Sequence, residues 1–284
     1  MKLQANARAS LGENGWPDDF RPDCLIFDVD GVLIDSSDSF PEMVRRAVEE
    51  EWAAAGFLAD APGYSPRLNS VFKLHGGFND DTHIAWGLLN MIAPENHGAG
   101  ACKLSGLIPS PDELERMIRT CGLDPVGWLR GNFKETFPLG RVIERCMRIY
   151  FGEGQEAGVY AREKPMLRAS WRDLPLPAYV FTGRSASEWD LAKAVLSWDD
   201  FPDERAVTSD SGILKPSGDG LALICRRFGH LSPLFFGDTA SDKMSFEAFR
   251  RGRFAAIGKI LRGAEPNFDS VGDALFNLIG WRDR

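Results

Sequence analysis

A short apolar run that ends in two closely spaced carboxylates constrains the fold of this chain most. Residues 25–27 have the length and composition of a buried parallel strand, and the chain continues directly with Asp28, Asp30 and Gly31. Side chains two residues apart on an extended chain point the same way, so Asp28 and Asp30 can face one point. Open α/β sheets bind ligands at the carboxyl ends of their strands. Two carboxylates crowded there repel each other unless a cation or a shared proton intervenes, which indicates a binding site; a solvated Asp-rich turn is the alternative.

The composition excludes several classes of protein. The 284 residues, 44% hydrophobic and 26% charged, are typical of a globular protein with one large core or two domains. A net charge of −8 and the lack of a Lys/Arg run argue against a nucleic-acid partner. No stretch has the length and apolarity of a membrane span, and residues 1–20 lack the apolar core of a signal peptide. We therefore expect a cytoplasmic protein without a membrane partner.

The cysteines and histidines are scattered along the chain. The five cysteines form no CxxC pair; they are Cys24, Cys102, Cys121, Cys146 and Cys225. This odd number without a pairing pattern predicts reduced thiols rather than a disulfide framework. Among the four histidines, His75 and His83 are eight residues apart and have no cysteine nearby. The spacing therefore predicts no zinc site.

The patterns of strand and helix divide the chain into three parts. Residues 1–21 are polar and are predicted to form an N-terminal arm. Residues 22–35 and 171–284 hold short apolar strands that alternate with helices, which predicts a Rossmann-like core with a parallel sheet. Residues 36–170 show helical spacing and no convincing strand. They are predicted to be an all-helical insertion into one α/β domain.

Periodicity places most of the elements. In the insertion, helices are expected at 40–55, 82–93, 111–121, 125–134 and 138–151, and Gly-containing stretches without helical spacing at 60–80 and 94–109. In the core, strands are expected at 25–27, 178–182, 206–208, 234–237 and 254–257, and helices at 187–198, 217–228, 241–251 and 271–281. Ser39 and Glu42 are spaced as a capping box, which predicts the start of the first helix.

Four polar motifs follow the predicted core strands or lie in the loops after them. They are Asp28 with Asp30, Thr182-Gly183-Arg184, Lys215-Pro216, and Gly237-Asp238-Thr239-Ala240-Ser241-Asp242. In type and order they resemble the four motifs of the haloacid dehalogenase-like hydrolase superfamily. The resemblance covers residues 22–40 and about 175–260, and the insertion after the first motif resembles the helical cap of the family's first class. Dehalogenase and phosphonatase branches lack an acid at position 30, so Asp30 favours a phosphatase or a phosphomutase.

The resemblance implies a magnesium-dependent phosphatase that acts on a small phosphorylated metabolite. Asp28 would attack phosphorus to form an aspartyl-phosphate, and Asp30 would protonate the leaving oxygen and then activate water. A neighbouring carboxylate is expected to raise the pKa of Asp30, so that it holds a proton near neutral pH. Thr182 and the backbone N–H of Gly183 would hold phosphate oxygens. Lys215 would neutralise charge on Asp28 and on the phosphate.

The same resemblance implies ligands for Mg²⁺. These would be Asp28, the backbone carbonyl of Asp30, and Asp238, while Asp242 would bind the metal or orient one of its waters. Each motif residue also has a structural alternative: Thr182 as a helix cap, Asp238 and Asp242 as acids at a helix N-terminus, and Lys215 as a surface lysine. Arg184 is interpreted as a salt-bridge or helix-start residue, and Asp35 as a turn cap.

Within the insertion, the stretch from Lys73 to Asp81 is predicted to contact substrate. Gly76 and Gly77 permit a close approach, and its polar side chains, above all Lys73 and Asn79, could contact the leaving group; the others are His75 and Asp80. The alternative is an exposed loop followed by a helix that starts at Asp80 or Asp81.

Three other functions stay open. A phosphomutase of the same superfamily would retain and return the phosphoryl group. A non-catalytic sensor of a phosphate ligand would be expected to lack one of the motif residues, whereas all of them are present. A helical module that binds a partner protein would need an exposed apolar patch. The sequence also leaves the substrate and the formation of a homodimer undecided.

Overall fold

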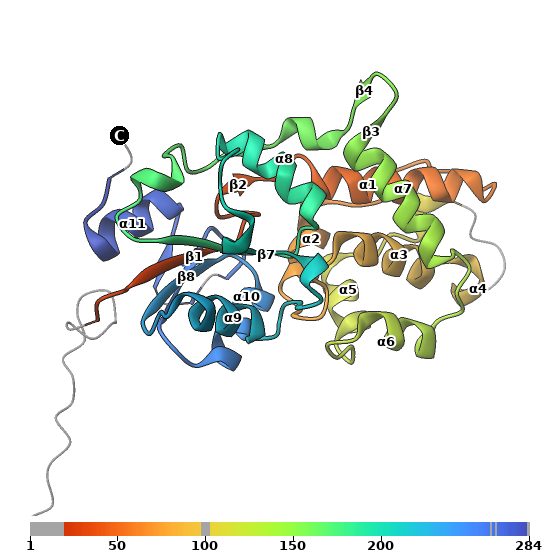
Figure 1. Ribbon diagram of the computed structural model, residues 1–284. Coiled ribbons are helices and arrows are strands. Elements are labelled where there is room, and N and C mark those ends of the chain that lie inside the picture. Colours follow the sequence, from red (N-terminus) through yellow and green to blue (C-terminus); the bar gives the residue numbers. More distant parts are fainter. Residues whose placement is uncertain (1–19, 98–102, 262, 265, 283–284) are drawn as a thin grey trace, which may run out of the picture.

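A parallel sheet of six strands forms the core of the computed structural model, which describes residues 20–97, 103–261, 263–264 and 266–282 (Figure 1). The strands are β1 (Cys24–Phe27), β6 (Ala178–Phe181), β7 (Ala206–Val207), β8 (Pro233–Gly237), β9 (Arg253–Ile257) and β10 (Asn267–Phe268), in the order β10-β9-β8-β1-β6-β7. β1 is central, and Leu25 pairs with Ala178 of β6 and with Leu234 of β8. The carboxyl ends of β1, β6 and β8 therefore lie together at one edge.

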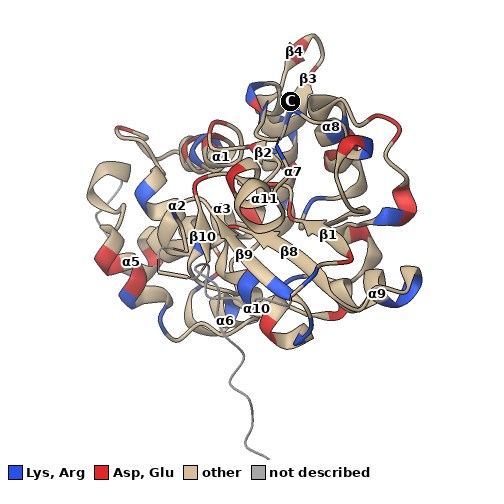
Figure 2. Ribbon diagram, turned by 90° about the vertical axis from the view of Figure 1, so that its left-hand side faces the viewer, with Lys and Arg blue, Asp and Glu red and all other residues tan. Residues whose placement is uncertain are grey.

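Helices cover both faces of this sheet. α8 (Ala186–Leu196) and α11 (Val271–Ile279) pack on the face that holds Leu25 and Phe27, whereas α9 (Asp219–Phe228) and α10 (Ala240–Phe249) pack on the face that holds Cys24 and Ile26. Because neither face meets water, the strands are continuous apolar runs rather than alternating ones. Figure 2 shows the strands β1 and β8 largely without charged residues, which lie mostly on helices and loops.

The insertion is a separate helical body at one end of the sheet (Figure 1). Its helices are α1 (Phe40–Ala54), α2 (Pro66–Lys73), α3 (Asp81–Ile92), α4 (Pro94–His97), α5 (Pro111–Ile118), α6 (Pro125–Asn132) and α7 (Leu139–Phe151). α1, α3 and α7 pack against one another around an apolar cluster of their own, which includes the fully buried Trp52 and Trp86. The insertion therefore has an apolar core of its own, separate from the two apolar clusters on the faces of the sheet. We call the insertion the cap.

Two pairs of short strands accompany these helices. β2 (Ile34–Asp35) and β5 (Lys164–Pro165) pair antiparallel where the chain enters and leaves the cap, and β3 (Gly152–Glu153) and β4 (Glu156–Ala157) form a hairpin after α7. The fold class is as predicted, but residues 36–170 contain the additional strands β3, β4 and β5, and β2 lies just before them. Strands of two residues are too short to produce an alternating pattern, so the sequence could not indicate them.

Other differences from the sequence-based expectations are local. α2, capped by Ser65, and β10 were not predicted, and the remaining core strands and helices end within three residues of their expected limits. The capping box is wrong: Ser39 precedes α1, but its side chain makes no cap bond, and Glu42 pairs with Arg45 instead. Residues 1–19 of the predicted arm and 98–102 of a predicted loop lie outside the described residues. No helix in the described part of the chain is long and apolar enough to cross a membrane.

Candidate active site

Lys215 joins two of the predicted carboxylates at the carboxyl edge of the sheet. Its Nζ lies 2.6 Å from Oδ1 of Asp28, directly after β1, and 2.6 Å from Oδ1 of Asp242, in α10. The three side chains are 2%, 8% and 0% exposed, respectively. A lysine buried between two carboxylates is not a surface lysine, so the structural alternative for Lys215 is excluded.

Burial and mutual repulsion dominate the electrostatics of the carboxylates. Burial, which is the largest cause, and the charge of Asp242 together raise the pKa of Asp28 to about 7, although Lys215 opposes both effects. Burial, together with Asp242 and Asp28, also raises the pKa of Asp238 well above its usual value. Crowded buried carboxylates of this kind are stabilised in their ionised form by a divalent cation.

The geometry of three carboxylates fits such a cation. Asp28, Asp238 and Asp242 offer oxygen atoms that all lie within 4.8 Å of one another. Oδ1 of Asp238 is buried and has no hydrogen-bond partner among the described residues. Oxygen-only ligands suit Mg²⁺, a hard cation.

The surrounding loop fixes these carboxylates. Oδ2 of Asp242 accepts from the N–H groups of Asp238 (3.3 Å) and Thr239 (3.0 Å) and forms the capping box of α10 with Thr239. Asp242 is thus a helix N-terminal acid and also a partner of Lys215, which suits an orienting role beside the metal. Gly31 has a φ of +71°, and a Cβ at this position would collide with the carboxylate of Asp238. Glycine is therefore required there both for its backbone conformation and for its lack of a side chain.

Asp30 is held by a buried arginine rather than left free. Nε and Nη2 of Arg184 donate to its two carboxylate oxygens at 3.0 and 2.7 Å, and the Arg184 side chain is only 1% exposed. Burial alone would raise the pKa of Asp30, but the charge and hydrogen bonds of Arg184 outweigh it and lower the pKa below its usual value. The expected rise in the pKa of Asp30 is therefore wrong for this arrangement. The interpretation of Arg184 as a salt-bridge residue is correct.

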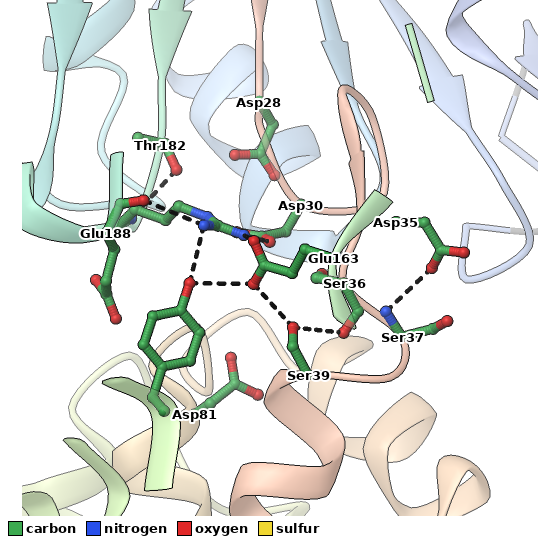
Figure 3. A network of polar contacts seen from close by, with 12 residues as sticks. Asp28, Asp30, Asp35, Ser36, Ser37, Ser39, Asp81, Glu163, Thr182 and Glu188 are labelled. Carbon is green, nitrogen blue, oxygen red and sulfur yellow. Dashed lines mark hydrogen bonds and ion pairs between the residues drawn. The ribbon is translucent and has the colours of Figure 1, made fainter. Parts of the chain in front are cut away.

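Arg184 is also part of a polar network between the core and the cap (Figure 3). Nη2 of Arg184 also donates to Oε2 of Glu163 at 2.9 Å, and Oε1 of Glu163 accepts from Ser39 (2.9 Å) and from Tyr150 (3.0 Å). Glu163 directly precedes β5, whereas Ser39 precedes α1 and Tyr150 lies in α7. Sequence reasoning missed Glu163 and Tyr150, because their partners are distant in the chain and no local motif marks them.

Thr182 and Gly183 directly follow β6, and Thr182 lies beside Asp28. Figure 3 shows Thr182 and Asp28 at the ends of their strands, with Asp30 and Glu163 below them. Oγ1 of Thr182 accepts from the N–H of Arg184 at 3.2 Å, which leaves its hydroxyl proton for another acceptor. The helix-cap alternative for Thr182 is excluded, because Ser185 caps α8.

The predicted stretch of the cap reaches this site from the opposite side. Oδ1 of Asn79 accepts from Ser241 of α10 at 2.7 Å, and Nδ2 of Asn79 would lie 2.7 Å from a Cβ on Gly183. Nζ of Lys73 donates to the carbonyl of Asn79 (3.1 Å) and to Asp81 (2.8 Å), and it interacts electrostatically with Asp30 and Asp238. Lys73 and Asn79 are thus brought to the core carboxylates.

Two other polar residues of the stretch are used within the cap. Nδ1 of His75 accepts from the N–H of Gly77 at 3.2 Å, and its Nε2 lies 2.9 Å from the carbonyl of Cys121, to which it donates. Asp80 caps α3 by accepting from the N–H of Thr82 at 2.8 Å. The structure therefore leaves no free hydrogen-bonding nitrogen on His75 for a substrate.

Comparison with known proteins agrees with this geometry. A model of the haloacid dehalogenase-like hydrolases matches residues 22–250. The chain belongs to this family. Its structure is similar to that of phosphatase Tt82 from Thermococcus thioreducens, with a TM-score of 0.58 and 25% identity over 86% of this chain and 95% of that chain. A family-like fold is also found in a protein from Lactobacillus delbrueckii subsp. bulgaricus, named provisionally as a phosphoglycolate phosphatase (TM-score 0.59, 15% identity, 92% of this chain and 100% of that chain). A search of curated proteins returns no significant match.

Proposed function

We propose that this haloacid dehalogenase-like hydrolase is a magnesium-dependent phosphatase of small phosphomonoesters. The observation that carries the proposal is the buried contact of Asp28 with Lys215, beside an unpartnered oxygen of Asp238. This arrangement provides a nucleophile, a positive charge to balance it, and oxygen ligands for a hard cation. The similarity to phosphatase Tt82 supports the same class of reaction.

The proposed reaction has two steps, both carried by residues of the core. A carboxylate oxygen of Asp28 bonds to phosphorus while the bond from phosphorus to the leaving oxygen breaks, and Asp30 gives its proton to that oxygen. Asp30 then accepts a proton from the water that attacks phosphorus, so that inorganic phosphate leaves and Asp28 is restored. Mg²⁺, held by Asp28 and Asp238, would lower the repulsion between the phosphate and the nucleophile. Thr182 and Gly183 would donate hydrogen bonds to phosphate oxygens.

Asp30 needs a different protonation state in each step, and Arg184 favours only one of them. The two hydrogen bonds from Arg184 to Asp30 favour the ionised carboxylate, which is the form needed to accept a proton from water. The first step needs the protonated form instead. A negatively charged phosphate group that enters beside Asp30 raises the pKa of Asp30 by like-charge repulsion. We therefore infer that Asp30 takes up its proton when the substrate binds.

Lys73 and Asn79 are proposed to contact the substrate from the cap. The positions of the two residues support this proposal. Asn79 accepts a hydrogen bond from Ser241 and lies against Gly183. The ammonium group of Lys73 interacts with the charges of Asp30 and Asp238. The part of the substrate that leaves would lie between these residues and the core. A cap in this position encloses a small molecule more readily than a polymer.

Phosphate release from a panel of compounds tests the function. Sugar phosphates, phosphoglycolate and nucleotides are supplied with Mg²⁺ and, separately, with EDTA. The wild type is expected to release phosphate only with Mg²⁺, and Asp28→Asn to lower the rate by about a thousandfold or more. Asp35→Asn is the matched control, because Oδ1 of Asp35 accepts from the N–H of Ser37 at 3.1 Å and an amide oxygen preserves that bond.

The outcomes separate the competing functions. Phosphate release that survives Asp28→Asn would overturn the covalent mechanism. Transfer of the phosphoryl group between positions of one sugar, without release, would identify a phosphomutase. Binding of phosphate compounds with neither release nor transfer would identify a sensor.

A further inference from the structure

A second group of side chains with metal-ligand atoms lies at the amino edge of the sheet, at the other end of β1 from Asp28. Asp23 directly precedes β1, Cys24 is the first residue of β1, Cys225 lies in α9, and His230 follows that helix. The carboxylate, thiol and imidazole of Asp23, Cys24 and His230 offer ligand atoms that all lie within 4.8 Å of one another. Cys225 is not one of these three residues, but its thiol is in hydrogen-bonding contact with the thiol of Cys24.

The imidazole is oriented as in a metal site. Nε2 of His230 lies 2.8 Å from the hydroxyl of Tyr179, and Nδ1 lies 3.7 Å from Oδ1 of Asp23. When Nε2 donates to Tyr179, Nδ1 carries the lone pair and faces Oδ1 of Asp23. Histidines that bind metals almost always donate their second ring nitrogen in this way, because the bond fixes the tautomer and the ring.

One carboxylate oxygen of the group has no hydrogen-bond partner among the described residues. Oδ2 of Asp23 accepts from the N–H groups of Leu231 (2.6 Å) and Ser232 (3.1 Å), so the carboxylate is firmly placed. Oδ1 is buried and forms no hydrogen bond within the described residues. Leaving a buried carboxylate oxygen without a hydrogen bond is unfavourable. Ligands about 2.1 Å from a tetrahedral zinc ion lie roughly 3.4 Å apart, so a shift of a few tenths of an ångström would fit Oδ1 and the His230 nitrogen to one ion.

Charge and access also suit a divalent cation. Two thiolates and one carboxylate carry three negative charges, of which a divalent ion balances two, and Arg251 lies against Cys225 to balance the third. Nη2 of Arg251 also donates to the carbonyl of His230 at 2.9 Å, which holds the loop in place. A surface hollow of about 530 Å³, lined among others by Cys225, His230 and Arg251, gives an ion a path to the group.

We propose that Asp23, Cys24, Cys225 and His230 form a second metal site, which binds a thiophilic divalent cation such as zinc. Thiolate and imidazole ligands select zinc over magnesium, and four protein ligands leave no open position for substrate. The site would therefore be structural: it would join the start of β1 to the end of α9. The sequence-based expectation of no zinc site rested on the spacing of His75 and His83, which are not part of this group. Here the fold rather than a local motif brings the candidate ligands together.

Titration with Co²⁺ tests the proposal directly. Full-length protein freed of metal is titrated with Co²⁺ in excess Mg²⁺, which occupies the oxygen site at the carboxyl edge. We expect one equivalent of Co²⁺ to give the near-ultraviolet absorption of a cobalt–thiolate bond together with the visible bands of tetrahedral cobalt. One equivalent of Zn²⁺ should abolish both. Bound Zn²⁺ should also raise the melting temperature, because it binds the folded state.

Two variants assign the ligands, and two controls exclude other sites. Cys24→Ser and His230→Gln should each weaken Co²⁺ binding at least tenfold, with a weaker thiolate band in Cys24→Ser. His230 is not in a strand or helix, so His230→Gln remains informative if Cys24→Ser fails to fold. Cys121→Ser, at a thiol of the cap, and Asp238→Asn, at the carboxyl edge, should leave the titration unchanged. A wild-type titration without the thiolate band, or an affinity that His230→Gln does not alter, would overturn the proposal.

Discussion

The two ends of β1 carry groups of opposite chemical character only four residues apart. At the carboxyl end, Asp28 meets two further carboxylates and Lys215, so every candidate ligand is an oxygen atom. At the amino end, Cys24 meets a thiol, an imidazole and one carboxylate. A hard cation suits the first set and a thiophilic cation the second. One buried strand can thus present two metal chemistries, because a parallel sheet gathers loops at both of its edges.

The two ends differ further in how their charges are balanced. Lys215 and Arg184 are buried among the acids of the carboxyl end, whereas Arg251 lies at the mouth of a surface hollow at the amino end. Because its cations are buried, the carboxyl end is sensitive to single substitutions: removal of one partner leaves a buried charge unpaired. The partly open amino end should tolerate change better.

The largest expected effect is that substitutions at the two ends of β1 each impair a different property of the protein. Asp238→Asn removes a proposed Mg²⁺ ligand and should lower phosphate release about a hundredfold or more, without altering Co²⁺ binding to thiolate. Cys24→Ser should weaken Co²⁺ binding and leave the rate of phosphate release per folded molecule within about twofold, because it touches no reacting group. Parallel assays of both variants decide the matter. Loss of both properties in either variant would show that the two ends are not independent.

A buried ion pair should matter far more than an exposed one. Arg184→Gln leaves Glu163 buried without its cation and should lower the free energy of unfolding by about 3–5 kcal/mol. Arg172→Gln is the matched control, because Arg172 pairs with Asp200 at the surface; it should cost less than about 1 kcal/mol. Urea unfolding of both variants measures the difference. Equal, small changes would mean that burial does not strengthen the dependence on Arg184.

Alanine substitutions at two glycines with positive φ distinguish the effect of backbone strain from the effect of crowding at the site. Gly31 (φ +71°) lies against Asp238, whereas Gly56 (φ +87°) has open space where a Cβ would be. Alanine at either position should destabilise the fold by roughly 1–2 kcal/mol through strain. Only Gly31→Ala should also displace Asp238 and lower the rate of phosphate release, by up to about a hundredfold. A normal rate in Gly31→Ala would contradict the placement of Asp238.

The smallest effect is expected from the residue that orients the imidazole. Tyr179→Phe removes the hydroxyl beside Nε2 of His230 and should weaken Co²⁺ binding about tenfold, with the thiolate band retained. Competition with a chromogenic chelator measures the affinity. An unchanged affinity would show that Tyr179 does not position the ring.

The sequence predicted the fold class and the residues of the carboxyl end because their signals are local. A buried strand that ends in Asp28 and Asp30 can be recognised from a dozen residues, and the same holds for Lys215 and the Asp238 run. Parallel pairing then necessarily brings these strand ends together.

The residues that sequence reasoning missed have partners far away in the chain. Ser39 was predicted to cap α1, but its hydroxyl bonds to Glu163, a residue that nothing nearby marks as buried. The expected rise in the pKa of Asp30 failed for the same reason, since the decisive neighbour is Arg184 and not Asp28. Cys24 and His230 likewise have ordinary local surroundings, so only the assembled fold brings their ligand atoms together.

The pairing of β2 with β5 determines how the cap can move. Both chain crossings lie in this one antiparallel pair, which contacts α8 on one face of the sheet, so the cap is attached as if by a hinge along a single edge. A rotation about that axis would separate the opposite side, where Asn79 contacts Ser241 of α10. Glu163, adjacent to β5, would barely move and could keep its bond to Arg184 throughout. If the proposed phosphatase opens in this way to release its product, the contact between Asn79 and Ser241 must break, and the rate of release would depend on the strength of that contact.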